Sequence, residues 1–282
     1  MMSLAQAARS LNARLIGADT GFASVSTDSR KIERGALFVA LRGERFDGHA
    51  YVGPVAAAGA AAAMVDSQSQ LDTSLPLLVV EDTRVSLGKL AAAWRGRFTL
   101  PLIAVVGSNG KTTVKEMIAA ILREHFGAAR VLATEGNFNN VIGLPLTLLA
   151  LRDTHLAAVV EIGMNHPGET ATLASIAGAT IAVVNNAQRE HQEFMKSVAD
   201  VACEHAALPA SLPRGGVAVI NADDTHAAIW REAAVGAGAS VRDFGLAGDA
   251  SVQTRHALGQ HGSRLELIAP EGETSFELPV PG

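Results

Sequence analysis

The chain has 282 residues, with 23 lysines and arginines against 28 aspartates and glutamates, so its formal net charge is −5. Hydrophobic residues make up 48% of it and charged residues 18%, which excludes a disordered chain and allows a sizeable core. The slightly acidic balance argues against nucleic acid or an anionic membrane as a main partner, because binding phosphates over a broad surface needs an excess of basic residues.

The cysteine count, the apolar runs and the length indicate the cellular compartment and the number of domains. The single cysteine, Cys203, excludes an internal disulfide framework and fits a reducing compartment. No apolar run reaches 18 residues, and the amino terminus lacks the basic-then-apolar layout of a signal peptide. We therefore expect a cytoplasmic protein without stable membrane insertion, and the length predicts two domains.

The amino-terminal part of the chain mixes short strands and helices without a regular alternation. Its predicted elements are a strand over 35–41, a short packed helix over 52–61, a strand over 77–81 and a long helix over 82–97. Asp82 or Thr83 is the expected N-cap of the long helix, since both types accept backbone hydrogen bonds there. We place the domain boundary in this helix and its tail, near residues 82–100.

From residue 102 onward, strands and helices alternate regularly. Near-continuous apolar strands separated by helices are typical of a mostly parallel sheet covered on both faces, so the expected fold class is α/β. After Arg242 short alternating strands predict an antiparallel meander. The predicted parallel strands span 102–107, 129–133, 157–163, 179–186 and 215–221.

Several side chains have a packing interpretation. Cys203 falls on the apolar side of a predicted helix and is expected to be a buried thiol, and Trp94 and Trp230 are expected to pack in the core. Charged residues after the strand at 179–186 predict a solvated loop containing Arg189, Glu190 and Lys196. On the helix after the first parallel strand, the apolar residues expected on one face are Val114, Met117, Ile118, Ile121 and Leu122.

A glycine-rich loop joins that strand and helix: Gly107, Ser108, Asn109, Gly110, Lys111, Thr112 and Thr113. Glycines let backbone N–H groups approach phosphates, a lysine neutralises the β- and γ-phosphates, and a following threonine hydroxyl can hold Mg²⁺. The spacing departs from G-x-x-x-x-G-K-[ST], because Val105 occupies the first glycine position. An ordinary glycine turn is the alternative, but a strand, GKT and a helix in register favour a nucleoside triphosphate site.

Further polar residues follow the later strands, where open α/β sheets bind ligands. Thr134, Asn137 and Asn139 lie in TEGNFNN, which on spacing alone is equally a polar turn before the next helix. Glu161 ends a buried strand, and a carboxylate there favours a magnesium ligand. His191 by itself is expected to be a loop histidine, because imidazole is an unusual ligand for magnesium.

These segments together resemble the Mur ligases, the ATP-dependent amide-forming enzymes of peptidoglycan synthesis. VVGSNGKTT resembles the short phosphate loop of the family, and TDSRKIERGALFVALRGERFDGHAYV resembles its uridine-nucleotide domain. TEGNFNNVIGLPLTLL and EIGMNHPGE are similar to the branch that joins D-alanyl-D-alanine to UDP-N-acetylmuramoyl-tripeptide. The resemblance runs from about residue 25 to the end. It implies a UDP-sugar-binding domain at 1–82, a linker helix at 83–100 and a central ATP-binding domain at 101–282, without the third domain of the family.

The resemblance also implies roles for particular residues. The UDP-sugar site would contain Ser29, Arg30, Asp47, Gly48 and His49. The loop Gly107–Thr113 would bind ATP, with Lys111, Glu161 and His191 as catalytic residues. A first magnesium ion would be held by Thr112 and Glu161 and a second by His191. Thr134, Asn137 and Asn139 would border the phosphate and substrate cleft.

The implied reaction moves a phosphoryl group from ATP to the tripeptide carboxylate, and the D-alanyl-D-alanine amine then attacks this acyl phosphate. Two departures from the family accompany it. His205 stands where many members have a carbamylated lysine, and the chain ends at Gly282, so we expect a monomeric fragment that is inactive alone and a reaction without a carbamate. The alternatives are another ligase of the family, adding the third stem residue or acting on folate, and a nucleotide-binding fragment without catalysis.

Overall fold

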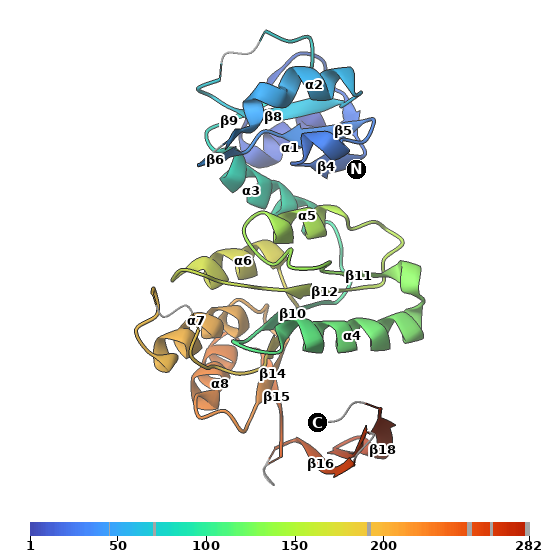
Figure 1. Ribbon diagram of the computed structural model, residues 1–282, viewed down its shortest axis with the longest axis vertical. Helices are drawn as coiled ribbons and strands as arrows, with labels where there is room; N and C mark the ends of the chain where they lie inside the picture. The colour runs from blue at the N-terminus through green and yellow to red at the C-terminus, as the bar shows by residue number, and fades with distance from the viewer. Residues whose placement is uncertain (45, 70–71, 191–192, 247–249, 260–261, 280–282) are drawn as a thin grey trace. The chain divides into compact units, whose positions relative to one another are not determined.

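The computed structural model describes residues 1–282 except for residues 45, 70–71, 191–192, 247–249, 260–261 and 280–282. The chain forms two compact units (Figure 1). The amino-terminal unit contains Met1–Leu100 and Thr134–His155, and the phosphate-loop unit contains Pro101–Ala133 and Leu156–Gly282. The segment 134–155 therefore lies in the amino-terminal unit, although it falls within the predicted central domain at 101–282. The predicted domain limits stay predictions, because compactness alone does not define a domain.

The amino-terminal unit contains a five-stranded sheet in the order β2-β9-β8-β5-β4. Its strands β4, β5, β8 and β9 are parallel neighbours, whereas β2 is antiparallel to β9. The bounds are β2 (Arg14–Ile16), β4 (Ser24–Ser26), β5 (Ala36–Val39), β8 (Ala62–Asp66) and β9 (Leu77–Val80). Short pairs form between β1 (Met2–Ser3) and β3 (Gly21–Phe22), and between β6 (Arg42–Gly43) and β7 (Phe46–Asp47).

The helices of this unit are α1 (Leu4–Leu11), α2 (Val52–Ala57), α3 (Thr83–Arg95) and α5 (Gly143–Leu149). The two strands and two helices predicted here are confirmed with shorter bounds. Asp82 is the N-cap of α3, since its carboxylate accepts from the N–H groups of Arg84 and Val85. Trp94 is 5% exposed and donates to the Leu151 carbonyl at 3.1 Å, so its packing role is confirmed.

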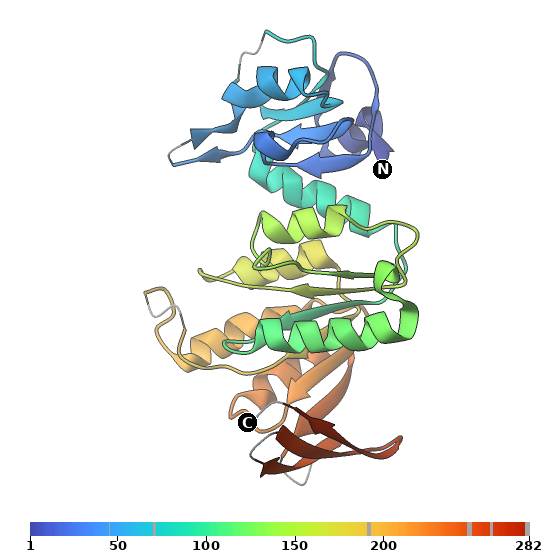
Figure 2. The ribbon, with the colours of Figure 1, turned by 45° about the vertical axis from the view of Figure 1, so that its right-hand side comes forward.

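The phosphate-loop unit is built on a nine-stranded sheet in the order β11-β12-β10-β13-β14-β15-β16-β17-β18. Every neighbouring pair from β11 to β16 is parallel. Strand β17 is antiparallel to both of its neighbours, β16 and β18, so the antiparallel meander is confirmed as well (Figure 2). The strand bounds are β10 (Leu102–Val106), β11 (Val131–Ala133), β12 (Ala157–Glu161), β13 (Ile181–Val184), β14 (Val217–Asn221), β15 (Ser240–Gly245), β16 (Val252–Gly259), β17 (Gly262–Ala269) and β18 (Gly272–Leu278).

The helices of this unit are α4 (Lys111–Phe126), α6 (Glu169–Ala177), α7 (Val198–Ala210) and α8 (Ala227–Gly236). Helix α4 covers a core cluster that includes Ile103 and Val105 of β10. Because strand side chains alternate, the buried Leu102, Ala104 and Val106 point to the opposite face. The sheet is therefore covered on both faces around β10, which explains its continuous apolar sequence.

The packing predictions for these helices are wrong for three residues. Val114, Ile118 and Leu122 pack against the core of the sheet as predicted. Met117 and Ile121 are instead 50% and 70% exposed, because the face of α4 that meets the sheet is centred on Ile118, Lys115 and Ala119. Cys203 is exposed. The buried residues of α7 are Val201, Ala202, His205, Leu208 and Pro209, and Cys203 lies on the other side of that stripe.

The prediction for Trp230 is confirmed, since this residue is fully buried and donates to the Ala202 carbonyl at 2.9 Å. Within the described residues, no helix combines the length and the apolar character needed to cross a membrane.

Candidate nucleotide-binding site

The glycine-rich loop follows β10 and leads into α4. Gly107 and Gly110 have φ values of +147° and +76°, a backbone region in which side chains are strained. A Cβ atom on Gly107 would lie 2.9 Å from Asn185 Cβ. Both glycines are therefore required, and they bring the backbone to the amino terminus of a 16-residue helix. Such a terminus presents unpaired N–H groups and partial positive charge, which suits a phosphate.

Lys111 is the first residue of α4, and its side chain folds back over the loop. Its Nζ atom donates to the Gly107 carbonyl at 2.6 Å and to the Ser108 carbonyl at 3.3 Å. The Glu190 Oε2 atom lies 4.0 Å from the same Nζ. The ammonium group is thus held beside the loop, where it can neutralise phosphate oxygens.

Thr112 and Glu161 meet although they are far apart in the sequence. Glu161 ends β12 in register with Val105 of β10, so the carboxyl ends of the two strands lie next to each other. The Thr112 hydroxyl donates to Glu161 Oε2 at 2.8 Å, and Glu161 is 3% exposed. The structure therefore brings together two of the three predicted metal ligands.

This donor set fits magnesium. A hydroxyl and a carboxylate are hard oxygen ligands, and Mg²⁺ usually binds through one or two carboxylates together with water and substrate phosphates. Among the residues that the structure describes, no group of three or more His, Cys, Asp or Glu side chains could hold a metal ion by itself. A cation here would therefore complete its coordination with phosphate oxygens and water.

A second loop, residues 185–190, is hydrogen-bonded to the phosphate loop, and we call it the clamp loop. It follows β13, which is the parallel neighbour of β10. Asn186 accepts from the Asn109 N–H through Oδ1 at 2.9 Å and from the Ser108 N–H through its carbonyl at 3.0 Å. Asn185 Nδ2 donates to the Asn109 carbonyl at 2.7 Å, and Asn109 Nδ2 donates to Gln188 Oε1 at 2.7 Å. Sequence reasoning predicted a loop here but missed its contacts with the phosphate loop, which its position after a central strand could have indicated.

Glu190 is not solvated, which corrects the expectation for this residue, whereas Arg189 and Lys196 are exposed as expected. Its side chain is 13% exposed, with Oε1 at 2.9 Å from the Ser108 hydroxyl and at 3.2 Å from His205 Nε2. Burial raises the pKa of this carboxyl, but the hydrogen bond and charge of His205, together with Lys111 and Ser108, outweigh it and hold the pKa below its usual value. Tertiary contacts thus turn a polar loop residue into part of the site.

The remaining predicted residues of the phosphate-loop unit are less informative. His191 lies outside the described residues, so its proposed metal contact stays a prediction. In the EIGMNHPGE segment, Glu169 accepts from the Asn165 N–H at 2.6 Å and lies 2.9 Å from His166 Nδ1. These contacts shape the turn before α6. Glu204 accepts from the N–H groups of Gly168 and Thr170 at the start of that helix.

In the amino-terminal unit, a cavity of about 460 Å³ contains part of the predicted UDP-sugar site. Arg30 is largely exposed, and its hydrogen bond to Asp28 lowers the pKa of that carboxyl to about 2. The cavity also has aromatic walls that sequence reasoning missed, although two of them, Phe46 and Tyr51, flank the DGH segment. The lining residues are Thr27, Asp28, Ser29, Arg30, Phe38, Phe46, Gly48 and Tyr51.

His49 is engaged by the protein itself. It is 5% exposed, its Nδ1 atom lies 2.6 Å from Asp47 Oδ1, and its Nε2 atom accepts from the Asp66 N–H at 3.0 Å. Arg42 joins both carboxylates, with Nη1 at 2.7 Å from Asp47 and Nε at 2.6 Å from Asp66. At Gly48 a Cβ would lie 2.7 Å from the Leu41 carbonyl oxygen. His49, Asp47, Asp66 and Arg42 therefore form a clasp at the base of the β6–β7 hairpin.

The TEGNFNN segment belongs to the amino-terminal unit. Thr134 is buried, whereas Asn137 is exposed and its carbonyl accepts from the Asn139 N–H at 2.7 Å. Asn140 Oδ1 accepts from the N–H groups of Ile142 and Gly143 ahead of α5. The segment thus contains the polar turn that was one of its two interpretations, and its contact with a substrate stays a prediction.

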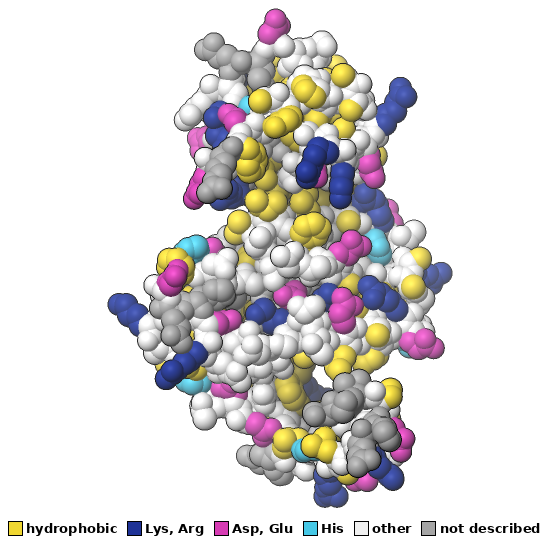
Figure 3. Space-filling view, viewed as in Figure 1, with side chains coloured by type: hydrophobic (Ala, Val, Ile, Leu, Met, Phe, Trp, Pro, Cys, Tyr) yellow, Lys and Arg dark blue, Asp and Glu magenta, His cyan; other side chains and the backbone are white. Residues whose placement is uncertain are grey.

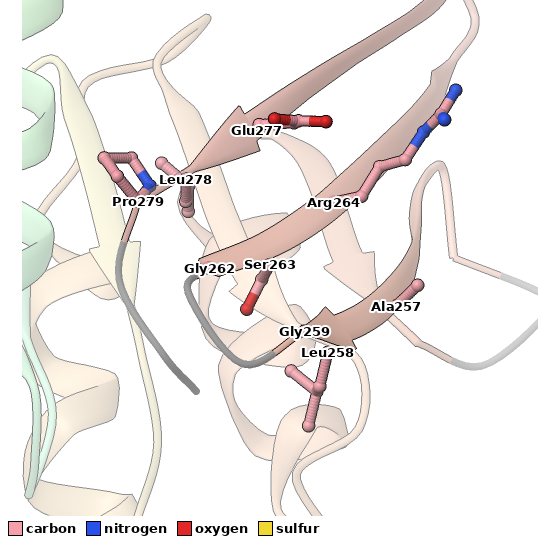
Figure 4. A pocket seen from close by; sticks show the side chains of 9 residues that line it. All are labelled: Ala257, Leu258, Gly259, Gly262, Ser263, Arg264, Glu277, Leu278 and Pro279. Atoms are coloured by element: carbon pink, nitrogen blue, oxygen red, sulfur yellow. The ribbon is translucent and has the colours of Figure 1, made fainter.

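Two other features bear on ligand binding. A cavity of about 590 Å³ lies against β16, β17 and β18 and contains none of the predicted site residues (Figure 4). Its charged lining residues, Arg264 and Glu277, are direct cross-strand partners. On the face shown in Figure 3, acidic and basic side chains are intermixed.

Comparisons with known proteins agree with this geometry. The family description "Mur ligase middle domain" matches residues 105–282, and "Mur ligase family, catalytic domain" matches residues 22–120. The chain is 40% identical over 282 residues to the UDP-N-acetylmuramoyl-tripeptide--D-alanyl-D-alanine ligase of Escherichia coli (strain K12). The match covers 100% of this chain and 61% of that protein, so the chain spans less than two thirds of the relative's length.

Solved structures with the same fold include MurF from Acinetobacter baumannii, with a TM-score of 0.89 and 32% identity. That match covers 99% of this chain and 61% of the other. MurF ligase from Thermotoga maritima in complex with ADP has a TM-score of 0.79 and 26% identity, covering 90% of this chain and 57% of that one.

Proposed function

This chain belongs to the Mur ligase family, and on that premise we propose that it is the nucleotide-binding and UDP-sugar-binding part of a larger ligase. The proposed reaction joins D-alanyl-D-alanine to UDP-N-acetylmuramoyl-tripeptide with ATP in peptidoglycan precursor synthesis. The identity of 40% along the whole chain to the Escherichia coli ligase supports this substrate pair. The cytoplasmic location and monomeric state expected from the sequence remain part of the proposal.

The observation that carries the proposal is the grouping of Lys111, Thr112 and Glu161 at the carboxyl ends of β10 and β12. Lys111 would neutralise the transferring phosphate, and Thr112 and Glu161 would hold Mg²⁺. When bound, ATP supplies the phosphoryl group that activates the tripeptide carboxylate, and Mg²⁺ screens its charge. The contribution of the protein is preorganisation, because the loop N–H groups and the Lys111 ammonium are already aligned before the substrates bind.

The first 82 residues are proposed to bind the UDP-sugar. The cavity beside Ser29 and Arg30 supports this, because its aromatic walls suit a base and its arginine suits a phosphate. We further propose that His191 holds a second magnesium ion and that the reaction needs no carbamate. The histidine at position 205 supports the second point, since an imidazole has no primary amine on which the carbamate could form.

Two alternatives remain open to test. Another ligase of the family would share the phosphate loop but use a different amine, so substrate-dependent phosphate release by the full-length protein distinguishes them. Residues 1–282 could also bind the nucleotide without catalysing ligation. We expect that behaviour of this chain alone, because it spans 61% of the length of its relatives.

The direct test is ATP binding to residues 1–282 by calorimetry in Mg²⁺. Lys111→Ala should weaken the affinity by about 100-fold or more, because it removes charge-assisted contacts to phosphate. Lys89→Ala changes an exposed lysine of α3 and serves as the matched control. Unchanged ATP affinity in a folded Lys111→Ala variant would contradict the phosphate-loop assignment.

A further inference from the structure

Glu190 is a carboxylate that the proposed reaction does not use, yet it lies within the site. Its Oε1 atom is shared by the Ser108 hydroxyl and His205 Nε2, and its Oε2 atom faces Lys111 Nζ at 4.0 Å. Burying a carboxylate is costly unless polar groups surround it. Glu190 is therefore held in place by three partners from different elements.

His205 holds this carboxylate from the side of α7. The residue is 2% exposed, and its Nδ1 atom has no hydrogen-bond partner within the described residues. An apolar side chain would fill the same space without leaving a ring nitrogen unpaired. Packing alone therefore does not explain an imidazole here, whereas the contact of its other nitrogen with Glu190 does.

The other end of this contact lies in the phosphate loop. The Ser108 hydroxyl accepts a hydrogen bond from the Gln188 N–H. The Ser108 carbonyl is one of the two carbonyls that accept a hydrogen bond from the Lys111 ammonium. The amide side chains of the clamp loop hold Asn109 but do not contact the Ser108 hydroxyl in the described structure. The Ser108 hydroxyl therefore contacts the main chain of Gln188, through its N–H and carbonyl, and among side chains the Glu190 carboxylate.

We propose that Glu190 is a positioning residue of the phosphate loop and that His205 sets its position. The chain of contacts runs from His205 Nε2 to Glu190 Oε1 and on to the Ser108 hydroxyl. It holds Ser108, and with it the carbonyls beside Lys111, in the shape that receives a phosphate. Neither residue touches the nucleotide. Both hold the phosphate loop in its binding conformation beforehand, which reduces the entropy that the loop would otherwise lose on binding. This role rests on the proposed function, since it presumes a nucleotide at the loop.

The test is a double-mutant cycle on Mg-ADP affinity, measured by calorimetry with residues 1–282. Glu190→Ala should weaken binding about tenfold, or about 1.4 kcal/mol, and His205→Ala by a similar factor. The double variant should bind about as weakly as the weaker single variant, because both changes break the same contact. Glu190→Gln should stay within about threefold of the unmodified chain, since an amide oxygen can accept both hydrogen bonds at Oε1.

His256→Ala and Glu124→Ala change an exposed imidazole and an exposed carboxylate of the same unit and serve as controls. If Glu190→Ala does not fold, Glu190→Asp keeps the charge but withdraws the oxygens by one methylene, and it should weaken binding several-fold. The role is overturned if Glu190→Ala, or Glu190→Asp where the alanine variant does not fold, binds like the unmodified chain, or if the two single effects multiply in the double variant. An unmodified chain that fails to bind Mg-ADP overturns the proposed function as well, which separates the two failures.

Discussion

Replacing His49 by alanine tests whether this residue contacts the ligand or stabilises the folded structure. The resemblance to the family places His49 in the UDP-sugar site. In the structure, Asp47 and Asp66 occupy both of its ring nitrogens, and the residue is 5% exposed. The clasp fixes the β6–β7 hairpin, whose Phe46 lines the cavity together with Tyr51. We therefore expect His49→Ala to act first on stability.

The magnitude follows from the contacts that are lost. The variant loses a hydrogen bond to a carboxylate at 2.6 Å and leaves the Asp66 N–H without its imidazole acceptor. A buried donor without a partner costs about 1–3 kcal/mol, and a lost hydrogen bond to a charged group costs about as much. The removed ring also leaves a void. The Asp47 side chain is 42% exposed, which places its hydrogen bond at the low end of that range, so the free energy of unfolding should fall by about 2–4 kcal/mol.

The assay combines urea unfolding with binding of a UDP-muramoyl peptide to the same preparation. His49→Ala should lower the urea midpoint, and its affinity at low temperature should fall only to the extent that the hairpin loosens. His49→Asn, which can still accept a hydrogen bond, should lose less stability than His49→Ala. His256→Ala serves as the exposed control, because its side chain lies on the surface of β16.

One pattern would refute this reasoning. If His49→Ala keeps the unfolding free energy of the unmodified chain but loses ligand affinity by 100-fold or more, on the order of a direct charged contact, then His49 contacts the ligand. In that case the clasp seen here would have to open when the UDP-sugar binds.

Three further changes test other parts of the structure. Glu161→Gln should remove the gain in ADP affinity that Mg²⁺ provides while leaving metal-free ADP binding within about threefold; an unchanged Mg-ADP affinity would argue against Glu161 as a ligand. Asp82→Ala removes the N-cap of α3 and should cost about 1 kcal/mol in urea unfolding, with the exposed Glu81→Ala as its control. The hydrogen bond from Arg42 lowers the pKa of Asp66 from 3.8 to about 2, so the folded state binds fewer protons than the unfolded state between these values. Stability from this group is present above pH 4 and is lost as the pH falls toward 2, and Asp66→Asn should show a shallower fall over that range.

The sequence by itself determined the features that depend on local backbone requirements and on periodicity. Gly107 and Gly110 adopt backbone angles that only glycine adopts readily, so the phosphate loop could be recognised without knowing its neighbours. Apolar strands alternating with helices predicted the parallel sheet, because such strands are buried on both faces. After Arg242 the pattern changes to short strands in which apolar and polar residues alternate, and this alternation predicted the antiparallel strands β16–β18.

Tertiary structure alone decided which side chains are buried and what they meet. Glu190 and Cys203 were both misjudged, because exposure depends on the elements packed against a segment rather than on its own pattern. The buried face of α4 is rotated away from Met117 and Ile121 by the way the helix lies on β10, β11 and β12. The sequence contains no signal for that rotation.

The site shows the same division. Thr112 and Glu161 could each be selected from its place after a strand, but their contact depends on β12 lying next to β10. The clamp loop reaches Asn109 because β13 lies on the other side of β10. Glu190 meets His205 because α7 packs against β13 and β10. Local chemistry therefore identifies the candidates, while strand order and helix packing, which involve residues distant in the chain, determine the partners.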